Sequence, residues 1–308
     1  MPRICYVARS FSQKTQTIID QANSIIDEYA AQDFDLTLRQ LYYQFVARGL
    51  LANSQKNYKR LGSIINDARL AGLIDWNRIT DRTRNLQSLS HWESPKDILS
   101  ACASQFRLDK WEGQTYRPEV WIEEEALAGV FERVCKELDV PYFSCRGYTS
   151  QSEMWVAGQR LKQWSNLGYI PIIFHFGDHD PSGIDMTRDI EDRLQMFVGG
   201  IELNRLALNI DRVATYKPPP NPAKTTDSPY ANYIKVHGHE SWELDALDPT
   251  IFANLVRNAI GAIRDEITWE SQVSAEEEHK RLLGIASNRW HDLTKSKVFR
   301  KECRNGED

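Results

Sequence analysis

The chain has 308 residues, of which 41% are hydrophobic and nine are tryptophan, so it has enough apolar side chains to build buried cores. Its length favours two domains over one. No apolar run approaches the roughly 18 residues that span a bilayer, and the first residues lack the apolar stretch of a signal peptide, so we expect no membrane segment. Five scattered cysteines without a Cys-x-x-Cys pair fit a reducing cytoplasm and argue against a zinc site or a disulfide framework.

Charge is distributed unevenly along the chain. The formal net charge is −5, yet nine basic residues face only three acidic ones between residues 39 and 84. That segment has an excess of six positive charges, which leaves −11 for the rest. A basic segment beside an acidic one is expected where a DNA-gripping domain adjoins a metal-binding domain, although many helical surfaces are as basic. The candidate DNA contacts are Arg48, Lys56, Lys59, Arg60 and Arg69.

The N-terminal part is predicted to be helical. Apolar residues at helical spacing indicate helices over residues 12–32, 37–48 and 57–71. Residues 73–76 look like a short strand. A helix, a turn, a helix and a strand with basic flanks are typical of a winged helix-turn-helix. We therefore predict a helical extension over residues 1–32 and a winged-helix domain over residues 33–115.

From residue 116 onward, strand and helix patterns alternate. A less regular stretch over residues 85–117 precedes them. Strands are predicted over residues 119–123, 140–145, 170–176 and 206–213, and helices over residues 126–138, 151–164 and 184–197. A Pro-rich loop follows at residues 217–222, and residues 249–295 are largely helical. The alternation implies an α/β domain over residues 116–308, with a mainly parallel sheet, helices on its faces and a helical C-terminal part.

Acidic residues are predicted at two strand ends of this sheet. Asp178 and Asp180 follow the strand 170–176, and their i, i+2 spacing directs both carboxylates to one side. Glu123 ends an earlier strand. Because parallel strands present their carboxyl ends at one edge, these oxygen donors would suit Mg²⁺ or Mn²⁺. His179 lies between the aspartates and is expected to pack or hydrogen-bond rather than to ligate a metal.

These motifs resemble a known domain. A buried strand ending in Glu, followed two units later by Gly-Asp-x-Asp-Pro-x-Gly, resembles the Toprim domain of topoisomerases, bacterial primases and some nucleases. The form Asp-His-Asp-Pro-Ser-Gly-Ile-Asp is similar to that of the topoisomerase VI A subunit and the related meiotic double-strand-break transesterase. Residues 240–247 resemble a stretch that follows Toprim in that group. The resemblance covers most of residues 33–250 and is strong at the motifs alone, and the chain is closest in size to the compact Mini-A relatives. It implies that the metal-binding acids are Glu123, Asp178 and Asp180.

The same family carries a catalytic tyrosine in a motif like Arg-x-x-Tyr-Tyr, and residues 39–43 read Arg-Gln-Leu-Tyr-Tyr. Tyr42 falls inside the apolar stripe of its helix and is expected in the core. Tyr43 falls outside that stripe and lies four residues from Arg39, on the same face. A neighbouring guanidinium would favour the phenolate and could hold the scissile phosphate. Tyr43 is therefore the candidate nucleophile and Arg39 its partner.

The resemblance implies a transesterase. Tyr43 would attack double-stranded DNA and form a 5′-phosphotyrosyl linkage, assisted by Mg²⁺ or Mn²⁺. It also implies a homodimer with composite sites, a cytoplasmic, nucleoid-associated location and a separate ATPase subunit, because the chain has no P-loop motif. Two alternatives stay open: a Toprim nuclease that uses metal-activated water, and a catalytically weak DNA-binding scaffold. The family usually has Lys where Glu124 stands, which bears on metal affinity and phosphate contact.

Overall fold

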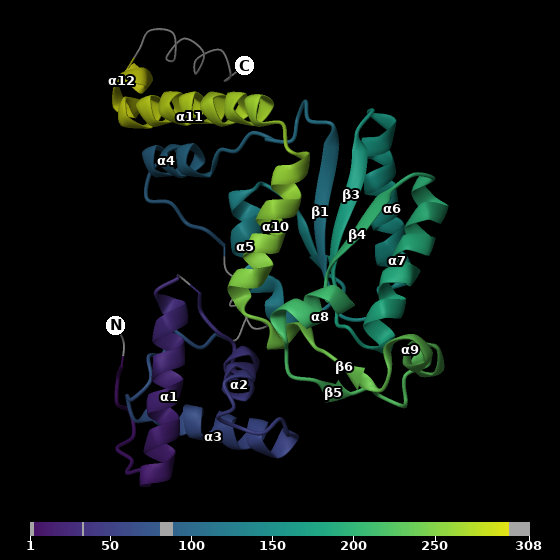
Figure 1. Ribbon diagram of the computed structural model, residues 1–308. Helices are drawn as coiled ribbons and strands as arrows, with labels where there is room; N and C mark the ends of the chain where they lie inside the picture. Colours follow the sequence, from purple (N-terminus) through teal and green to yellow (C-terminus); the bar gives the residue numbers. More distant parts are fainter. Residues whose placement is uncertain (1–2, 33, 81–88, 296–308) are drawn as a thin grey trace. The chain divides into compact units, whose positions relative to one another are not determined.

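The computed structural model describes residues 3–32, 34–80 and 89–295 (Figure 1). The chain forms two compact units, one comprising Met1–Asn85 and Tyr116–Ala262, the other Leu86–Thr115 and Ile263–Asp308. One division between the units lies at residues 115 and 116, where a domain boundary was predicted, whereas no division lies at residue 33. Residues 86–115 group with the C-terminal helices rather than with the helices that precede them. Within the described ranges, no helix is both long and apolar enough to cross a bilayer.

The first unit begins with the predicted helices, whose bounds are α1 (Gln13–Ala30), α2 (Leu38–Ala47) and α3 (Gln55–Leu70). Each begins after a hydroxyl residue whose side chain accepts a backbone N–H of the first turn: Ser12, Thr37 and Ser54. Their apolar faces share one core, which includes Ile19 of α1, Leu41 of α2 and Leu61 of α3. Amphipathic spacing and caps therefore account for this helical cluster.

The predicted strand over residues 73–76 is wrong, because these residues form turns. The carboxylate of Asp75 accepts the backbone N–H of Asn77 at 2.9 Å, an Asx turn that competes with strand pairing. A single parallel bridge joins Leu36 to Ile79 instead. The basic residues Arg82 and Arg84 lie outside the described residues. In the part of the chain that is described here, no strand pair of a wing is formed.

A four-stranded sheet forms the centre of this unit, with the strands β1 (Tyr116–Ile122), β2 (Tyr142–Ser144), β3 (Ile170–Phe176) and β4 (Glu202–Ala207). The order is β2-β1-β3-β4 and every pair is parallel, which confirms the predicted parallel sheet. The strand predicted over residues 206–213 is wrong: β4 ends at Ala207 and α8 (Ile210–Tyr216) follows. The apolar residues there also fit a helical spacing, and a short apolar run does not distinguish the two.

Helices cover both faces of the sheet (Figure 1). The helices α6 (Gln151–Asn166) and α7 (Pro181–Val198) lie on one face, where Met154 and Leu194 pack against Trp121 and Ile173. The short η1 (Glu125–Leu127), α5 (Ala128–Glu137) and α10 (Pro249–Ile263) follow on the other side, where the rings of Phe131, Phe176 and Phe252 meet. The sheet is thus buried on both faces, as parallel sheets are.

Between β4 and α10 the chain crosses the carboxyl edge of the sheet. This connection contains α8, β5 (Asn221–Pro222), α9 (Tyr230–His237), β6 (Glu240–Ser241) and η2 (Leu244–Ala246). β5 and β6 pair antiparallel. The backbones of His179 and Trp242 exchange two hydrogen bonds of 2.8 and 2.9 Å, which fastens the connection to the loop that follows β3. The carboxyl edge is therefore covered by a segment far away in sequence.

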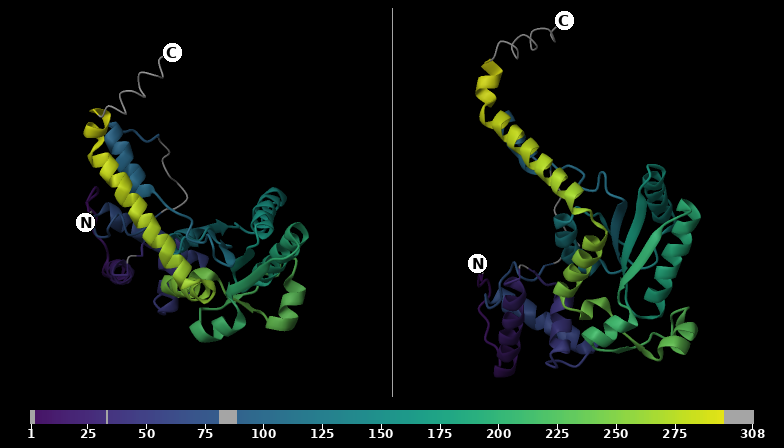
Figure 2. Two further views of the ribbon diagram at one scale, coloured as in Figure 1. Left: turned by 90° about the horizontal axis from the view of Figure 1, so that it is seen from above. Right: turned by 45° about the horizontal axis from the view of Figure 1, so that its top comes forward.

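The second unit contains α4 (Pro95–Gln105), α11 (Glu266–Asn288) and α12 (Trp290–Lys295). Helix α4 lies inside the stretch predicted to be irregular. It begins at a Ser94 cap followed by Pro95, a favourable start for a helix. It runs beside α11, as Figure 2 shows, and the Ser287 hydroxyl of α11 donates to the Lys96 carbonyl at 3.0 Å. Packing on α11 stabilises a helix whose own apolar pattern is weak.

Candidate functional site

The three predicted acids lie together at the carboxyl edge of the sheet. Ile122 and Phe176 are paired in the register of β1 and β3, so the residues that follow them emerge side by side. The Oε2 atom of Glu123 accepts the backbone N–H of Asp178 at 2.9 Å. Asp180 caps α7, and its Oδ1 accepts the N–H of Gly183 at 2.7 Å. The sheet register thus brings Glu123 to the aspartate loop across 55 positions in sequence.

Glycines make this close approach possible. A Cβ atom at Gly183 would overlap the carbonyl oxygen of Asp178 and lie 2.9 Å from Oε2 of Glu123. A Cβ atom at Gly177 would lie 2.8 Å from the Arg205 guanidinium and 3.0 Å from the same Glu123 oxygen. Both positions therefore need glycine because there is no space for a side chain, which is a stronger reason than the tight turn itself.

An arginine that the sequence interpretation missed lies beneath the acids. The guanidinium of Arg205 donates to the carbonyls of Gly177 (2.8 Å), Asp178 (2.6 Å) and Gly183 (3.0 Å). Burial lowers the pKa of Arg205 to about 10, and the carboxylates of Glu123, Asp178 and Asp180 oppose that fall. Arg205 therefore supplies positive charge to the acids while holding the backbone that carries them.

Burial and mutual repulsion make the acids reluctant to ionise. Burial raises the pKa of Glu123 from 4.5 to about 7, with Asp180 adding to the rise and the Arg205 guanidinium opposing it. Burial, together with the nearby Glu123 charge, raises the pKa of Asp178 well above its usual range. A divalent cation at this edge would reverse both effects, because it favours the ionised form of each ligand.

The donor chemistry at this edge suits a hard cation. Hydrogen bonds within the described residues use one oxygen of each acid, namely Glu123 Oε2, Asp178 Oδ1 and Asp180 Oδ1. The second oxygen of Asp180 lies 3.7 Å from the Nζ atom of Lys224. Across residues 3–32, 34–80 and 89–295, no three His, Cys, Asp or Glu side chains already have the spacing of a metal cage. Mg²⁺ ordinarily keeps several waters and takes one or two carboxylates, so it does not require such a cage.

The tyrosine helix reaches the same edge through residues 242–245. The Tyr43 hydroxyl donates a hydrogen bond to Oε2 of Glu243, and Arg39 Nη2 donates to that oxygen at 3.0 Å. Arg39 Nε also lies 2.5 Å from Oδ2 of Asp245. The backbone N–H of Leu244 donates to Oδ1 of Asp178 at 2.8 Å. Three consecutive residues thus connect the candidate nucleophile and its arginine to the candidate metal ligands.

Glu124 belongs to this network as well. Its Oε1 lies 3.4 Å from Arg39 Nη2, so this acidic side chain faces the arginine of the tyrosine motif. The side chain of Arg39 is 37% exposed, while that of Asp245 is fully buried. Burial raises the pKa of Asp245 to about 7, and the Arg39 guanidinium opposes that rise. Arg39 is therefore the cation that keeps these carboxylates together.

The environment of Tyr43 differs from the prediction. Both tyrosines of the motif are buried, with exposed fractions of 3% for Tyr42 and 7% for Tyr43. The Tyr42 hydroxyl accepts the backbone N–H of Ser54 at 2.7 Å and so has a structural role at the start of α3. Burial and the Glu243 carboxylate raise the pKa of Tyr43 above its usual range, and the lowering effect of Arg39 is smaller. The predicted effect of Arg39 is present, since its guanidinium lowers the pKa of Tyr43, but burial and the Glu243 carboxylate, which helical spacing could not reveal, outweigh it.

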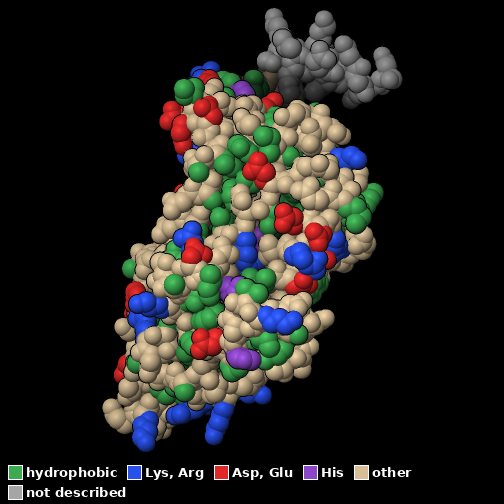
Figure 3. Space-filling model, turned by 45° about the vertical axis from the view of Figure 1, so that its right-hand side comes forward, with side chains coloured by type: hydrophobic (Ala, Val, Ile, Leu, Met, Phe, Trp, Pro, Cys, Tyr) green, Lys and Arg blue, Asp and Glu red, His purple; other side chains and the backbone are tan. Residues whose placement is uncertain are grey.

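The predicted DNA contacts divide into two kinds. Lys56, Lys59 and Arg60 are exposed on α3. Arg69 is half-buried, donates to the Trp76 carbonyl at 2.8 Å and stacks 4.6 Å from the centre of that ring, and Arg48 pairs with a glutamate at 2.9 Å. Figure 3 shows Lys and Arg side chains projecting at the end of this face where Figure 1 places α3. The exposed trio is thus free to meet phosphates.

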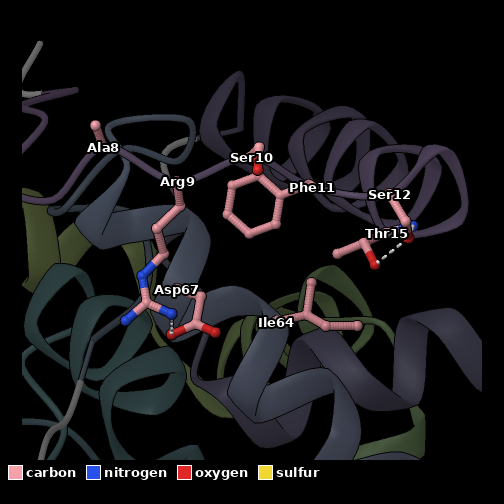
Figure 4. Close-up of a pocket in the computed structure, with 8 residues that line it drawn as sticks. All are labelled: Ala8, Arg9, Ser10, Phe11, Ser12, Thr15, Ile64 and Asp67. Atoms are coloured by element: carbon pink, nitrogen blue, oxygen red, sulfur yellow. Dashed lines mark hydrogen bonds and ion pairs between the residues drawn. The ribbon is translucent and has the colours of Figure 1, made fainter.

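A pocket of about 520 Å³ lies apart from these residues, between the segment that precedes α1 and helix α3 (Figure 4). Arg9 Nη1 pairs there with Asp67 Oδ1 at 2.9 Å, and the hydroxyls of Ser12 and Thr15 are 3.0 Å apart. The pocket shares no lining residue with the acids or with Tyr43. Its charged groups neutralise each other, so it contributes nothing to the candidate site.

Comparison with known proteins identifies no relative: no family model, curated protein or solved structure matches the chain. The site is therefore defined by its own geometry. That geometry adds Arg205, Lys224, Glu243 and Asp245 to the predicted residues. A charged residue within the apolar stretch around Leu203 and Leu206 was the available signal for Arg205, whereas the contact of Glu243 with Tyr43 left no sequence signal.

Proposed function

We propose that this protein is a metal-dependent, DNA-cleaving transesterase of the kind seen in type IIB topoisomerase A subunits. Tyr43 is the nucleophile, and attack on a phosphodiester would yield a 5′-phosphotyrosyl linkage and a free 3′ hydroxyl. The observation that carries the proposal is the bridge through residues 243–245. It joins Tyr43 and Arg39 on one side to Asp178 on the other, within a single chain.

Arg39 is proposed to bind the scissile phosphate. A guanidinium suits phosphate geometry, and Arg39 already gathers three carboxylate groups from Glu124, Glu243 and Asp245. A DNA phosphate would compete with these carboxylates for the same donors. The exposed face of α3, with Lys56, Lys59 and Arg60, would grip the duplex backbone independently of sequence.

Mg²⁺ or Mn²⁺ is proposed to bind at Glu123, Asp178 and Asp180. When bound, such an ion would stabilise negative charge at the scissile phosphate. The support is the donor set itself: buried oxygen ligands at the end of two adjacent parallel strands, with raised pKa values for Glu123 and Asp178. Arg205 holds the backbone of this loop whether or not the ion is present.

We further propose the arrangement that the resemblance implies: a winged-helix domain that carries Tyr43, a Toprim domain that carries the acids, and a homodimer acting on double-stranded DNA. Strand passage would need a separate ATPase subunit. The parallel sheet and the cluster of α1, α2 and α3 are compatible with these domain types. In a dimer, Tyr43 of one copy would act together with the acids of the other copy. Its hydrogen bond to Glu243 would then be made to Glu243 of that other copy.

The decisive experiment incubates the protein with end-labelled duplex DNA and Mg²⁺ or Mn²⁺, followed by a denaturing gel for protein-linked ends. Tyr43→Phe should abolish the adduct, while the matched control Tyr42→Phe should keep it, because Tyr42 serves the start of α3. If DNA is still cut by Tyr43→Phe without any adduct, the protein is a metal-dependent nuclease. If DNA binds to α3 and neither product forms in any metal, the protein is a scaffold.

A further inference from the structure

Among the residues that the structure describes, Glu243 is the one carboxylate in contact with the hydroxyl of the candidate nucleophile. Its Oε2 accepts from the Tyr43 hydroxyl and, at 3.0 Å, from Nη2 of Arg39. Its side chain is 17% exposed, so the contact is largely shielded from water. The position is set from both sides: the Leu244 N–H is bonded to Asp178, and Trp242 exchanges two backbone hydrogen bonds with His179. Glu243 is therefore held against Tyr43 by the acid loop itself.

We propose that Glu243 is a catalytic residue that accepts the phenolic proton when Tyr43 attacks DNA, an inference that rests on the proposed transesterase function. A buried phenol with a raised pKa does not ionise unaided near neutral pH. Arg39 cannot take the proton, since a guanidinium is already protonated. Among the described residues, Glu243 is the only hydrogen-bond partner of the Tyr43 hydroxyl.

The step balances without any further reagent. The Tyr43 oxygen forms a bond to phosphorus, the bond from phosphorus to the 3′ oxygen breaks, and the phenolic proton passes to Oε2 of Glu243. The 3′ oxygen leaves with the electron pair of the broken bond and takes a proton from water. In the reverse direction, protonated Glu243 returns its proton to the departing tyrosine oxygen. One carboxylate thus serves both cleavage and resealing, as microscopic reversibility requires.

The charged neighbours of this pair set how it responds to pH. Arg39 from α2 faces both partners, Asp245 faces Arg39 and Tyr43, and Lys224 faces Glu243 from the loop after β5. The Tyr42 ring packs edge-on at 5.5 Å and carries no charge.

The test compares Glu243→Gln with Asp245→Asn, which removes a neighbouring carboxylate from the same arginine. Adduct formation on labelled duplex DNA is measured against pH with saturating Mg²⁺. Glu243→Gln should lower the rate at neutral pH by about 10²- to 10⁴-fold and should gain rate steadily as pH rises, because hydroxide must then remove the proton. A more acidic, fluorinated tyrosine at position 43 should restore much of that loss. Asp245→Asn should not gain rate steadily as pH rises, because Glu243 still accepts the proton, and the fluorinated tyrosine should not compensate for it.

Three outcomes would overturn the proposal. In the first, Glu243→Gln keeps the wild-type rate and pH profile. In the second, its rate rises, which would make the contact a restraint on Tyr43. In the third, Glu243→Gln loses rate, and neither alkaline pH nor the fluorinated tyrosine restores it, although circular dichroism shows that Glu243→Gln and Glu243→Asp are both folded. If the wild-type protein forms no adduct, the proposed transesterase function is wrong. If the wild-type protein forms the adduct and Glu243→Gln forms it equally well, only the proposed role of Glu243 is wrong.

Discussion

Arg205 offers a measure of how strongly the acid loop depends on one buried cation. Arg205→Met keeps the length of the side chain but removes the donors that reach the carbonyls of Gly177, Asp178 and Gly183. A buried carbonyl that loses its hydrogen-bond partner costs about 1–3 kcal/mol of stability. Part of this loss is offset because the variant no longer has to desolvate a charged guanidinium on folding. Breaking a buried charge arrangement by removing one partner typically costs 3–5 kcal/mol, and we expect a loss of about 3 kcal/mol in the free energy of unfolding.

The pH dependence separates this effect from ordinary loss of packing. Without Arg205, the pKa values of Glu123 and Asp178 should rise further, so the loss should be larger at pH 8 than at pH 5. Urea unfolding at both pH values, without metal, is the measurement. Arg193→Met is the matched control, because Arg193 donates to the Thr149 carbonyl and to Asp189 but faces none of the acids. A loss below about 1 kcal/mol, or one equal at both pH values, would refute the assigned role of Arg205.

Further outcomes are expected from the same geometry. Burial raises the folded-state pKa of Glu123 from 4.5 to about 7, so the stability of the wild-type protein without metal should be highest at low pH and fall as pH rises from 4.5 to 7. Added Mg²⁺ should reverse this fall, and a melting temperature that does not change with Mg²⁺ would count against the metal site. Gly183→Ala should lower both stability and metal affinity because its Cβ overlaps the Asp178 carbonyl, whereas Gly200→Ala, where nothing lies near, should change neither. Replacing Lys56, Lys59 and Arg60 with Gln should weaken DNA binding and reduce the salt slope by about three, measured by fluorescence anisotropy across salt concentrations; an unchanged slope would place the duplex elsewhere. Mixing Tyr43→Phe with Asp178→Asn should restore part of the adduct if two copies form composite sites, and a mixture as inactive as its components would indicate action within one chain.

Much of the fold was predictable because its signals are local. Caps such as Ser54 and the apolar stripe of α2 identify helices, and the apolar run of β3 followed by the Pro181 start of α7 identifies a parallel strand–helix unit. The turn at residues 73–76 was missed because the hydrogen bond of Asp75 outweighs strand propensity. Helix α4 was missed because its stability comes from α11, almost two hundred positions away.

The candidate site was predictable only in part, for the same reason. The register of parallel strands places Glu123 beside Asp178 wherever β1 and β3 are adjacent, so the acids followed from the pattern. Contacts made by the connection after β4 have no such periodic signal. Glu243 reaches Tyr43 across 200 positions and Asp245 reaches Arg39 across a similar span, and neither spacing is encoded in a local repeat. The environment of the nucleophile therefore had to be seen in three dimensions.

The charge balance of the site gives a physical account of Glu124. Toprim domains that the sequence resembles usually have lysine at this position. Here the acids receive positive charge from elsewhere: Arg205 lies beneath the loop and Lys224 lies 3.7 Å from Asp180. Glu124 instead contacts Arg39, which is the same arginine that holds Glu243 against Tyr43. A lysine at this position would repel Arg39 and remove one of the three carboxylates that hold it. A glutamate at position 124 thus fits a site in which Arg205 of β4 and Lys224 after β5 supply the positive charge beside the acids. Glu124 then pairs with Arg39 and helps to hold the tyrosine helix.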